Sequence, residues 1–141
     1  MQVLVIDGQG GNIGSQVIKV LKKECKDLDI YAVGTNSIAT ANMLKSGALA
    51  AATGENSVVV ESRKADIIIG PIGIVIADSM MGEVTAKMAV AIAQSNAVRI
   101  LIPINKCDNR IAGYTNSSLT SLIQDVADKV KELTHQNTRM I

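Results

Sequence analysis

The chain has 141 residues, with 14 lysines and arginines against 13 aspartates and glutamates, and so a formal net charge of +1. This balance argues against a nucleic-acid-binding protein, and so does an aromatic content of 1%, because single-stranded sites stack bases on aromatic rings. Hydrophobic residues make up 48%, which excludes a disordered chain, and the length is typical of one domain, expected over residues 1–141.

No apolar run approaches the ~20 residues that a membrane-spanning helix needs. The longest run, residues 67–77, is interrupted by two glycines and a proline. No basic segment precedes the first apolar run, so no signal peptide is expected. The two cysteines, Cys25 and Cys107, match no zinc or redox spacing. We therefore expect a cytoplasmic protein with no membrane partner, no nucleic-acid partner and no metal site.

Short runs rich in Val and Ile alternate with longer stretches of helical spacing. The predicted strands cover residues 3–6, 30–33, 58–60, 67–69 and 100–104. The predicted helices cover residues 13–25, 38–48, 84–92 and 119–133, with Ser37 as the N-cap of the second. Residues 135–141 are predicted to be a frayed tail.

The predicted strands are apolar on both faces and are separated by helices, which is typical of a parallel sheet covered on each side. Right-handed crossovers then give a doubly wound arrangement. The fold class predicted is α/β: a single three-layer Rossmann-like domain with a mostly parallel sheet of about five strands.

The first strand is followed by a glycine-rich loop with the spacing Gly8-x-x-Gly11-x-x-Gly14. Glycines let a backbone approach a pyrophosphate closely, and the helix N-terminus that follows favours an anion. The spacing resembles the loop of extended short-chain dehydrogenases, with Asp7 where that family has Thr. The resemblance implies nucleotide binding, and the alternative is a tight turn that holds no ligand.

The resemblance to short-chain dehydrogenases covers only the first third of the chain. The second strand ends in Gly34-Thr35-Asn36, without the acidic residue that binds ribose in that family. The family's catalytic Tyr-x-x-x-Lys is also absent, since Tyr31 and Tyr114 are followed four residues on by Thr35 and Ser118. No catalytic activity is therefore inferred from this resemblance.

Four of the five polar loops beside the strands are expected at one edge of the sheet, where such folds bind their ligands. The candidate ligand-binding residues are Gly8, Gln9, Gly10, Gly11, Asn12, Ile13, Gly14, Thr35, Asn36, Gly70, Gly73 and Asn105. The expected ligand is a nucleotide-like small molecule, with NAD or NADP as the cofactor. No Arg follows the second strand to meet a 2′-phosphate, which favours NAD.

Residues 105–108 read Asn-Lys-Cys-Asp and match the NKxD guanine-reading motif of small GTPases. The phosphate-binding pattern G-x-x-x-x-G-K-S/T occurs nowhere in the chain. A GTPase is therefore not expected, and Asn105 is kept as a candidate contact to a base.

A second resemblance covers nearly the whole chain. It is carried by the strings IDGQGGNIG, GTNSIATANMLKSGA, ATGENSVVV and ADIIIGPIGIVIADSMMGE. These are similar to sequences of a family of short bacterial proteins described as a domain of unknown function. The resemblance implies a bacterial, cytoplasmic, stand-alone Rossmann-like protein and implies no reaction.

Two other functions stay open at this point. One is a small enzyme on a phosphorylated or nucleotide-like substrate, with Asp7, Glu55 or Asp78 as acid or base. Glu83 is another possible general base, but Asp78 and Glu83 are read more simply as residues at a helix start. The other is a structural or regulatory oligomer without a ligand, which associates through Met80–Met81 or the C-terminal helix. A homodimer fits each of these functions.

Overall fold

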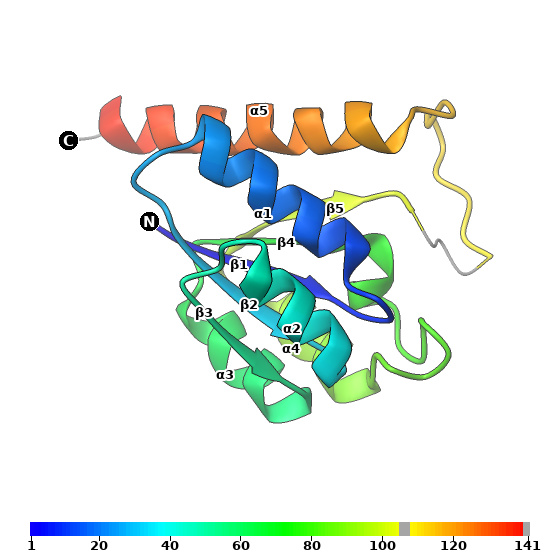
Figure 1. Cartoon of the computed structure of the whole chain (residues 1–141). Coiled ribbons are helices and arrows are strands. Elements are labelled where there is room, and N and C mark those ends of the chain that lie inside the picture. The colour runs from blue at the N-terminus through cyan, green and yellow to red at the C-terminus, as the bar shows by residue number, and fades with distance from the viewer. Residues whose placement is uncertain (105–107, 140–141) are drawn as a thin grey trace.

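The computed structural model describes residues 1–104 and 108–139, and it confirms the predicted α/β fold (Figure 1). Five parallel strands form one sheet in the order β3-β2-β1-β4-β5. The strands are β1 (Gln2–Asp7), β2 (Asp29–Gly34), β3 (Ala50–Thr53), β4 (Ile67–Pro71) and β5 (Val98–Ile102). The helices are α1 (Asn12–Glu24), α2 (Ser37–Lys45), α3 (Glu55–Lys64), the 3-10 turn η1 (Ile72–Val75), α4 (Ala86–Gln94) and α5 (Leu119–Arg139).

The helices cover both faces of the sheet and make three layers, with α1, α2 and α5 on one face and α3 and α4 on the other (Figure 1). The central strand β1 divides its side chains between the two cores. Val3 and Val5 pack with the helices of the first face, whereas Leu4 and Ile6 pack with those of the second. Burial on both sides explains why this strand is a continuous apolar run.

The third strand differs from the prediction. Residues 58–60 lie in α3, and the third strand is Ala50–Thr53. Three consecutive valines predicted a strand. Only Val58 of the three is buried, which is the pattern of a helix with one side packed against the core. The true strand consists of small residues at the edge of the sheet, so it gives little apolar signal. The loop after Thr53 therefore lies at the carboxyl edge with the other loops.

Three helix ends also differ from the prediction. Asn36, and not Ser37, caps α2, since its side chain accepts a hydrogen bond from the Ala39 amide. The fourth helix begins at Ala86, after the N-cap Thr85, and not at residue 84. The last helix runs to Arg139, well into the segment predicted to be a frayed tail.

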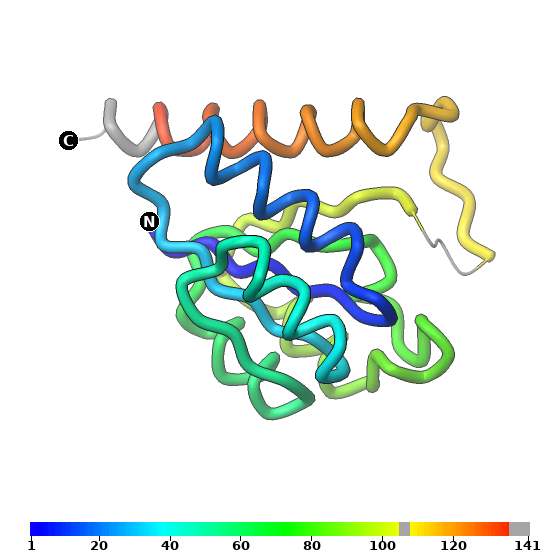
Figure 2. Tube along the Cα trace, viewed as in Figure 1, coloured from blue at the N-terminus to red at the C-terminus, as the bar shows by residue number. Residues whose placement is uncertain are grey.

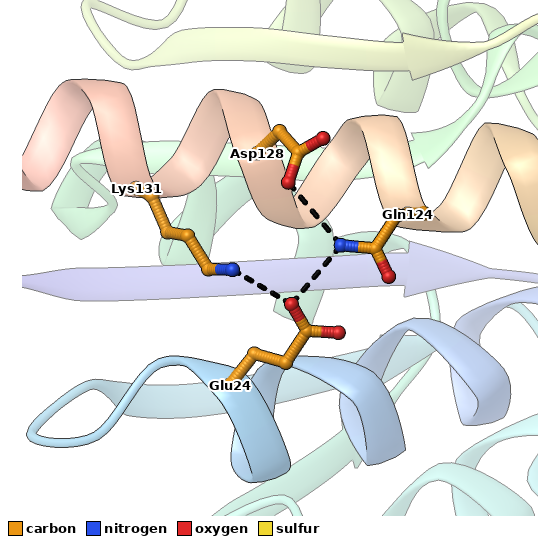
Figure 3. Close-up of polar contacts among 4 residues, drawn as sticks. All are labelled: Glu24, Gln124, Asp128 and Lys131. Carbon is orange, nitrogen blue, oxygen red and sulfur yellow. Dashed lines mark hydrogen bonds and ion pairs between the residues drawn. The ribbon is translucent and has the colours of Figure 1, made fainter.

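The last helix is joined to the first by a small polar cluster. The Glu24 carboxylate of α1 accepts hydrogen bonds from Lys131 Nζ at 2.7 Å and from Gln124 Nε2 at 3.0 Å (Figure 3). Gln124 also donates to Asp128 Oδ1 at 3.2 Å. The two helices lie side by side, although four of the five strands lie between them in the sequence (Figure 2).

Candidate functional site

The carboxyl ends of all five strands lie at one edge of the sheet. The chain leaves the adjacent strands β1 and β4 toward opposite faces, since α1 packs in the core of the first face and Ile74 of η1 packs in the core of the second. Such a switch point is where open α/β sheets bind their ligands. The residues around this edge therefore make up the candidate site.

Asp7 ends β1 and organises the glycine-rich loop. Its Oδ1 accepts a hydrogen bond from the Gly8 amide, and its Oδ2 accepts one from the Gly14 amide, both at 2.8 Å. The residue is only 4% exposed. Burial raises the pKa of this carboxyl, although the hydrogen bonds from backbone amides act against that rise. The first turn of α1 is thus bound by an anion that belongs to the protein itself.

Glu83 joins the loops that follow three different strands. Its Oε1 accepts hydrogen bonds from the Gln9 amide at 2.9 Å, from Thr35 Oγ1 at 2.6 Å and from Asn36 Nδ2 at 2.6 Å. Partial burial raises the pKa of Glu83, but the three hydrogen bonds together outweigh it, so the pKa lies below its ordinary value. Among the described residues nothing donates to the second oxygen, Oε2, which leaves that oxygen as an acceptor for a ligand.

Four residues that the sequence predicted for the site, at positions 9, 10, 35 and 36, do lie together. Asn36 Nδ2 also donates to the Gln9 carbonyl oxygen at 2.9 Å. Gln9 and Gly10 are exposed, whereas Thr35 and Asn36 are half-buried. The backbone of the loop is therefore open to solvent beside a fixed carboxylate.

The glycines of the loop serve packing more than ligand approach. A Cβ on Gly8 would lie 2.5 Å from Thr35 Oγ1 and 2.7 Å from Met80 Sδ. Gly11 adopts φ +72°, a left-handed conformation that glycine tolerates, and caps α1. A Cβ on Gly10, in contrast, would meet nothing within 4 Å. Gly10 is the glycine of this loop that is free to face a ligand.

The remaining predicted site residues lie in other surroundings. Asn12 is exposed at the start of α1, while Ile13 and Gly14 are buried. Gly70 is buried in β4, where a Cβ would lie within 2.4 Å of the Ile6 carbonyl oxygen, and Gly73 is buried in η1. The prediction for Asn105 falls outside the described residues.

The other candidate acids and the methionine pair are also separated. Glu55 Oε2 accepts a hydrogen bond from Thr85 Oγ1 at 2.6 Å, which links the starts of α3 and α4. Asp78 lies in an exposed turn with φ +67°. Met80 is 5% exposed and belongs to the core, whereas Met81 is 96% exposed. Only Met81 is thus available for a surface contact.

The sequence indicated Glu83 only as a helix-start residue or a possible general base, and not as a residue that binds a ligand. Its hydrogen bonds to Thr35 and Asn36 span 48 and 47 residues, so no local spacing in the sequence predicts them.

Within residues 1–104 and 108–139, no group of three His, Cys, Asp or Glu side chains is placed to hold a metal. In the same ranges, no helix is long and apolar enough to cross a membrane.

A family model described as "Domain of unknown function (DUF3842)" matches residues 2–135. The chain belongs to the DUF3842 family. This confirms the resemblance of the sequence strings to a family described as a domain of unknown function, whereas the resemblance to short-chain dehydrogenases stays a prediction.

No curated protein matches the chain. Among solved structures, the chain is similar to a dodecameric FMN-dependent UbiX-like decarboxylase from Escherichia coli O157:H7. The identity is 10%, the match covers 96% of this chain and 94% of the other, and the TM-score is 0.45.

Proposed function

We propose that this DUF3842 protein binds a nucleotide-type small molecule at the carboxyl edge of its sheet, and that Glu83 accepts hydrogen bonds from the ligand's sugar hydroxyls. The observation that carries the proposal is the saturation of Glu83 Oε1 by three donors, which fixes the carboxylate and leaves Oε2 for a ligand. An acidic side chain binds the ribose hydroxyls in many Rossmann folds.

We do not expect the phosphates of the ligand at the glycine-rich loop, where the glycine spacing predicted them. The Gly8, Gly14 and Gln9 amides already donate to carboxylates. A phosphate at this spot would lie next to two negative groups, Asp7 and Glu83, and would be repelled by both. The neutral, hydroxyl-bearing part of the ligand fits here better than its pyrophosphate.

The test compares binding of adenosine, NAD, NADP and FMN to the wild-type protein and to Glu83→Gln by isothermal titration calorimetry. Removing a hydrogen bond to a charged acceptor is expected to weaken binding by about tenfold or more. The matched control is Glu61→Gln, which neutralises a half-buried carboxylate whose one ion pair among the described residues is with Lys64. Equal affinity for Glu83→Gln and wild type, or no binding by any member of the panel, would overturn the proposal.

The other expectations from the sequence stay predictions, namely a cytoplasmic location, the choice of NAD over NADP, and an enzyme that uses Asp7, Glu55 or Asp78. The homodimer also stays a prediction. Its most direct test is the molar mass by light scattering of wild type and of Met81→Ser, because Met81 is 96% exposed. A dimer that uses this residue would dissociate in the variant.

A further inference from the structure

A polar hollow of ≈ 450 Å³ lies between α1 and α2, outside the group of contacts made by Glu83. Its lining residues are Gly10, Asn12, Ser15, Lys19, Asn42, Lys45 and Ser46. Two of these are lysines, none is acidic, and none has an aliphatic side chain. The wall is held in place by Asn42, whose Nδ2 donates to the Gly10 carbonyl oxygen at 2.7 Å. Both the charge and the hydrogen-bonding groups of this hollow suit an anion.

The two lysines come from different helices, Lys19 from α1 and Lys45 from α2. Both are exposed, and neither forms an ion pair with a described residue. Lysine ammonium groups are ordinary ligands of phosphate, to which they act as point charges. Two unpaired cations at one hollow thus provide the charge that a phosphate requires.

Ser15 also lines this hollow. The residue is 9% exposed, and its Oγ is buried without a hydrogen-bond partner among the residues that the structure describes. A buried hydroxyl without a partner costs free energy, so such groups are normally satisfied by protein, water or ligand. Ser15 lines the hollow between the helices that carry the two lysines. Its hydroxyl is not exposed to solvent in this structure, so it would have to rotate toward the hollow to donate a hydrogen bond to a phosphate oxygen.

We propose that this hollow binds a phosphate group, with Lys19 and Lys45 as the cations and Ser15 Oγ as a hydrogen-bond donor. The site goes beyond the proposed function, because it uses none of the atoms that hold Glu83. A free phosphate and the phosphate of a nucleotide carry the same chemistry, and the experiment separates the two sources.

A hollow on the opposite face provides a matched comparison. It lies between α3 and α4, has a volume of ≈ 320 Å³, and is also lined by two cations, Arg63 and Lys87. Ser62 Oγ is buried there as well, without a partner among the described residues. Its other walls, however, include the apolar Val59, Val90 and Ala91, and the hydroxyl of its Ser95 already donates to the Ser62 carbonyl oxygen. Gln94 remains as a polar wall residue, so this hollow offers fewer hydrogen bonds to phosphate oxygens, and we expect phosphate to prefer the hollow between α1 and α2.

The experiment follows backbone amide chemical shifts of the full chain during titration with inorganic phosphate, with the ionic strength held constant by sodium chloride. We expect saturable shifts at Ser15, Lys19 and Lys45. The double variant Lys19→Ala/Lys45→Ala is expected to lower the affinity about tenfold or more. The double variant Arg63→Ala/Lys87→Ala removes the same charge and should leave the affinity unchanged. No saturable shift at the hollow, or an equal loss in both double variants, would overturn the proposal.

Ser15→Ala separates a ligand role from a structural one. The substitution removes a buried hydroxyl that has no partner, so the melting temperature should stay the same or rise. Phosphate binding should nevertheless weaken roughly threefold. Unchanged binding by Ser15→Ala would contradict the role given to its hydroxyl.

Titration with adenosine 5′-monophosphate identifies the source of the phosphate. Tighter binding than inorganic phosphate, with shifts at both Ser15 and Gln9, supports a nucleotide phosphate in the hollow. Equal affinity with shifts at the hollow alone supports a site for free phosphate. Glu83→Gln keeps the hollow intact, so phosphate binding by this variant tests the hollow even if the proposed function fails.

Discussion

The Asp7 Oδ2 atom accepts a hydrogen bond from the Gly14 amide at 2.8 Å, so a side chain of β1 occupies the start of α1. In dinucleotide-binding Rossmann folds, the equivalent position attracts the pyrophosphate, since the first amides of the helix are unpaired and carry partial positive charge. Here the carboxylate takes that role inside the protein. The same glycine spacing therefore builds a loop that is closed by an acidic side chain.

Asp7→Asn tests whether this carboxylate holds the loop. An asparagine has only one acceptor oxygen, so its NH₂ group must face one of the amides of Gly8 and Gly14. An unsatisfied buried amide costs ~1–3 kcal/mol, and relief from burying a charge offsets part of this loss. We expect a net destabilisation of about 1 kcal/mol in urea unfolding. Asp29→Asn, at an exposed position in β2, is the control, and equal stability of the two variants would contradict the role of Asp7.

The hydrogen bonds to Glu83 predict a dependence of stability on pH. Since the folded pKa of Glu83 lies below its ordinary value of 4.5, the ionised carboxylate stabilises the fold above pH 4.5. That contribution is lost as the pH falls from 4.5 through the lowered folded pKa. Glu83→Gln removes the titration, so wild type should be the more stable protein at pH 7, and the difference should shrink toward pH 3. A constant difference in urea midpoint over this range would show that the carboxylate is not held as described.

The sheet and the position of the loop were predictable because the signals for them are local. The apolar run of β1 followed at once by Asp7 and Gly8 predicts a buried strand and a tight turn, and both are present. The third strand was missed because Ala50–Thr53 lies at an edge and has only small side chains, which show little contrast between faces. The valines at 58–60 were wrongly predicted to form a strand, because β-branched residues favour strands unless the packing of a helix outweighs that preference.

The central residue of the site could not be read from the sequence for a different reason. Glu83 reaches Thr35 from a segment of tight turns, in which the Ser79 amide donates to the Ile76 carbonyl oxygen and the Glu83 amide to the Met80 carbonyl oxygen. Several of these residues, including Asp78, Met80 and Met81, have positive φ although they are not glycines. Turns of this kind leave little pattern in the sequence, and neither does a contact across 48 residues. The prediction of Glu83 as a helix-start residue rested on local spacing alone.

Lys131→Met tests the link between α1 and α5 in Figure 3. Hydrogen bonds from Lys131 and Gln124 hold the pKa of Glu24 below its ordinary value, and the bond to Glu24 raises the pKa of Lys131. The pair is nevertheless still in contact with solvent, with side-chain exposures of 38% for Lys131 and 26% for Glu24, so its contribution is small and screened by salt. We expect a slightly lower melting temperature for Lys131→Met at low ionic strength and no difference from wild type in 1 M sodium chloride, where the Debye length is about 3 Å. A salt-independent loss would point to packing of the side-chain stem instead.

The two glycines Gly8 and Gly10 make the sharpest comparison within the loop. An alanine at position 8 would place its Cβ 2.5 Å from Thr35 Oγ1 and 3.1 Å from Glu83 Oε1, so the bond between those residues must shift. Overpacking of this kind typically costs ~1–3 kcal/mol, and we expect that loss in urea unfolding of Gly8→Ala. Gly10→Ala, with nothing within 4 Å of the new Cβ, should unfold like wild type. Because Gly10 also lines the hollow between α1 and α2, phosphate titration of this stable variant reports on ligand approach alone. Equal destabilisation by the two substitutions would mean that the loop needs glycine for its backbone conformation and not for the contact between Thr35 and Glu83.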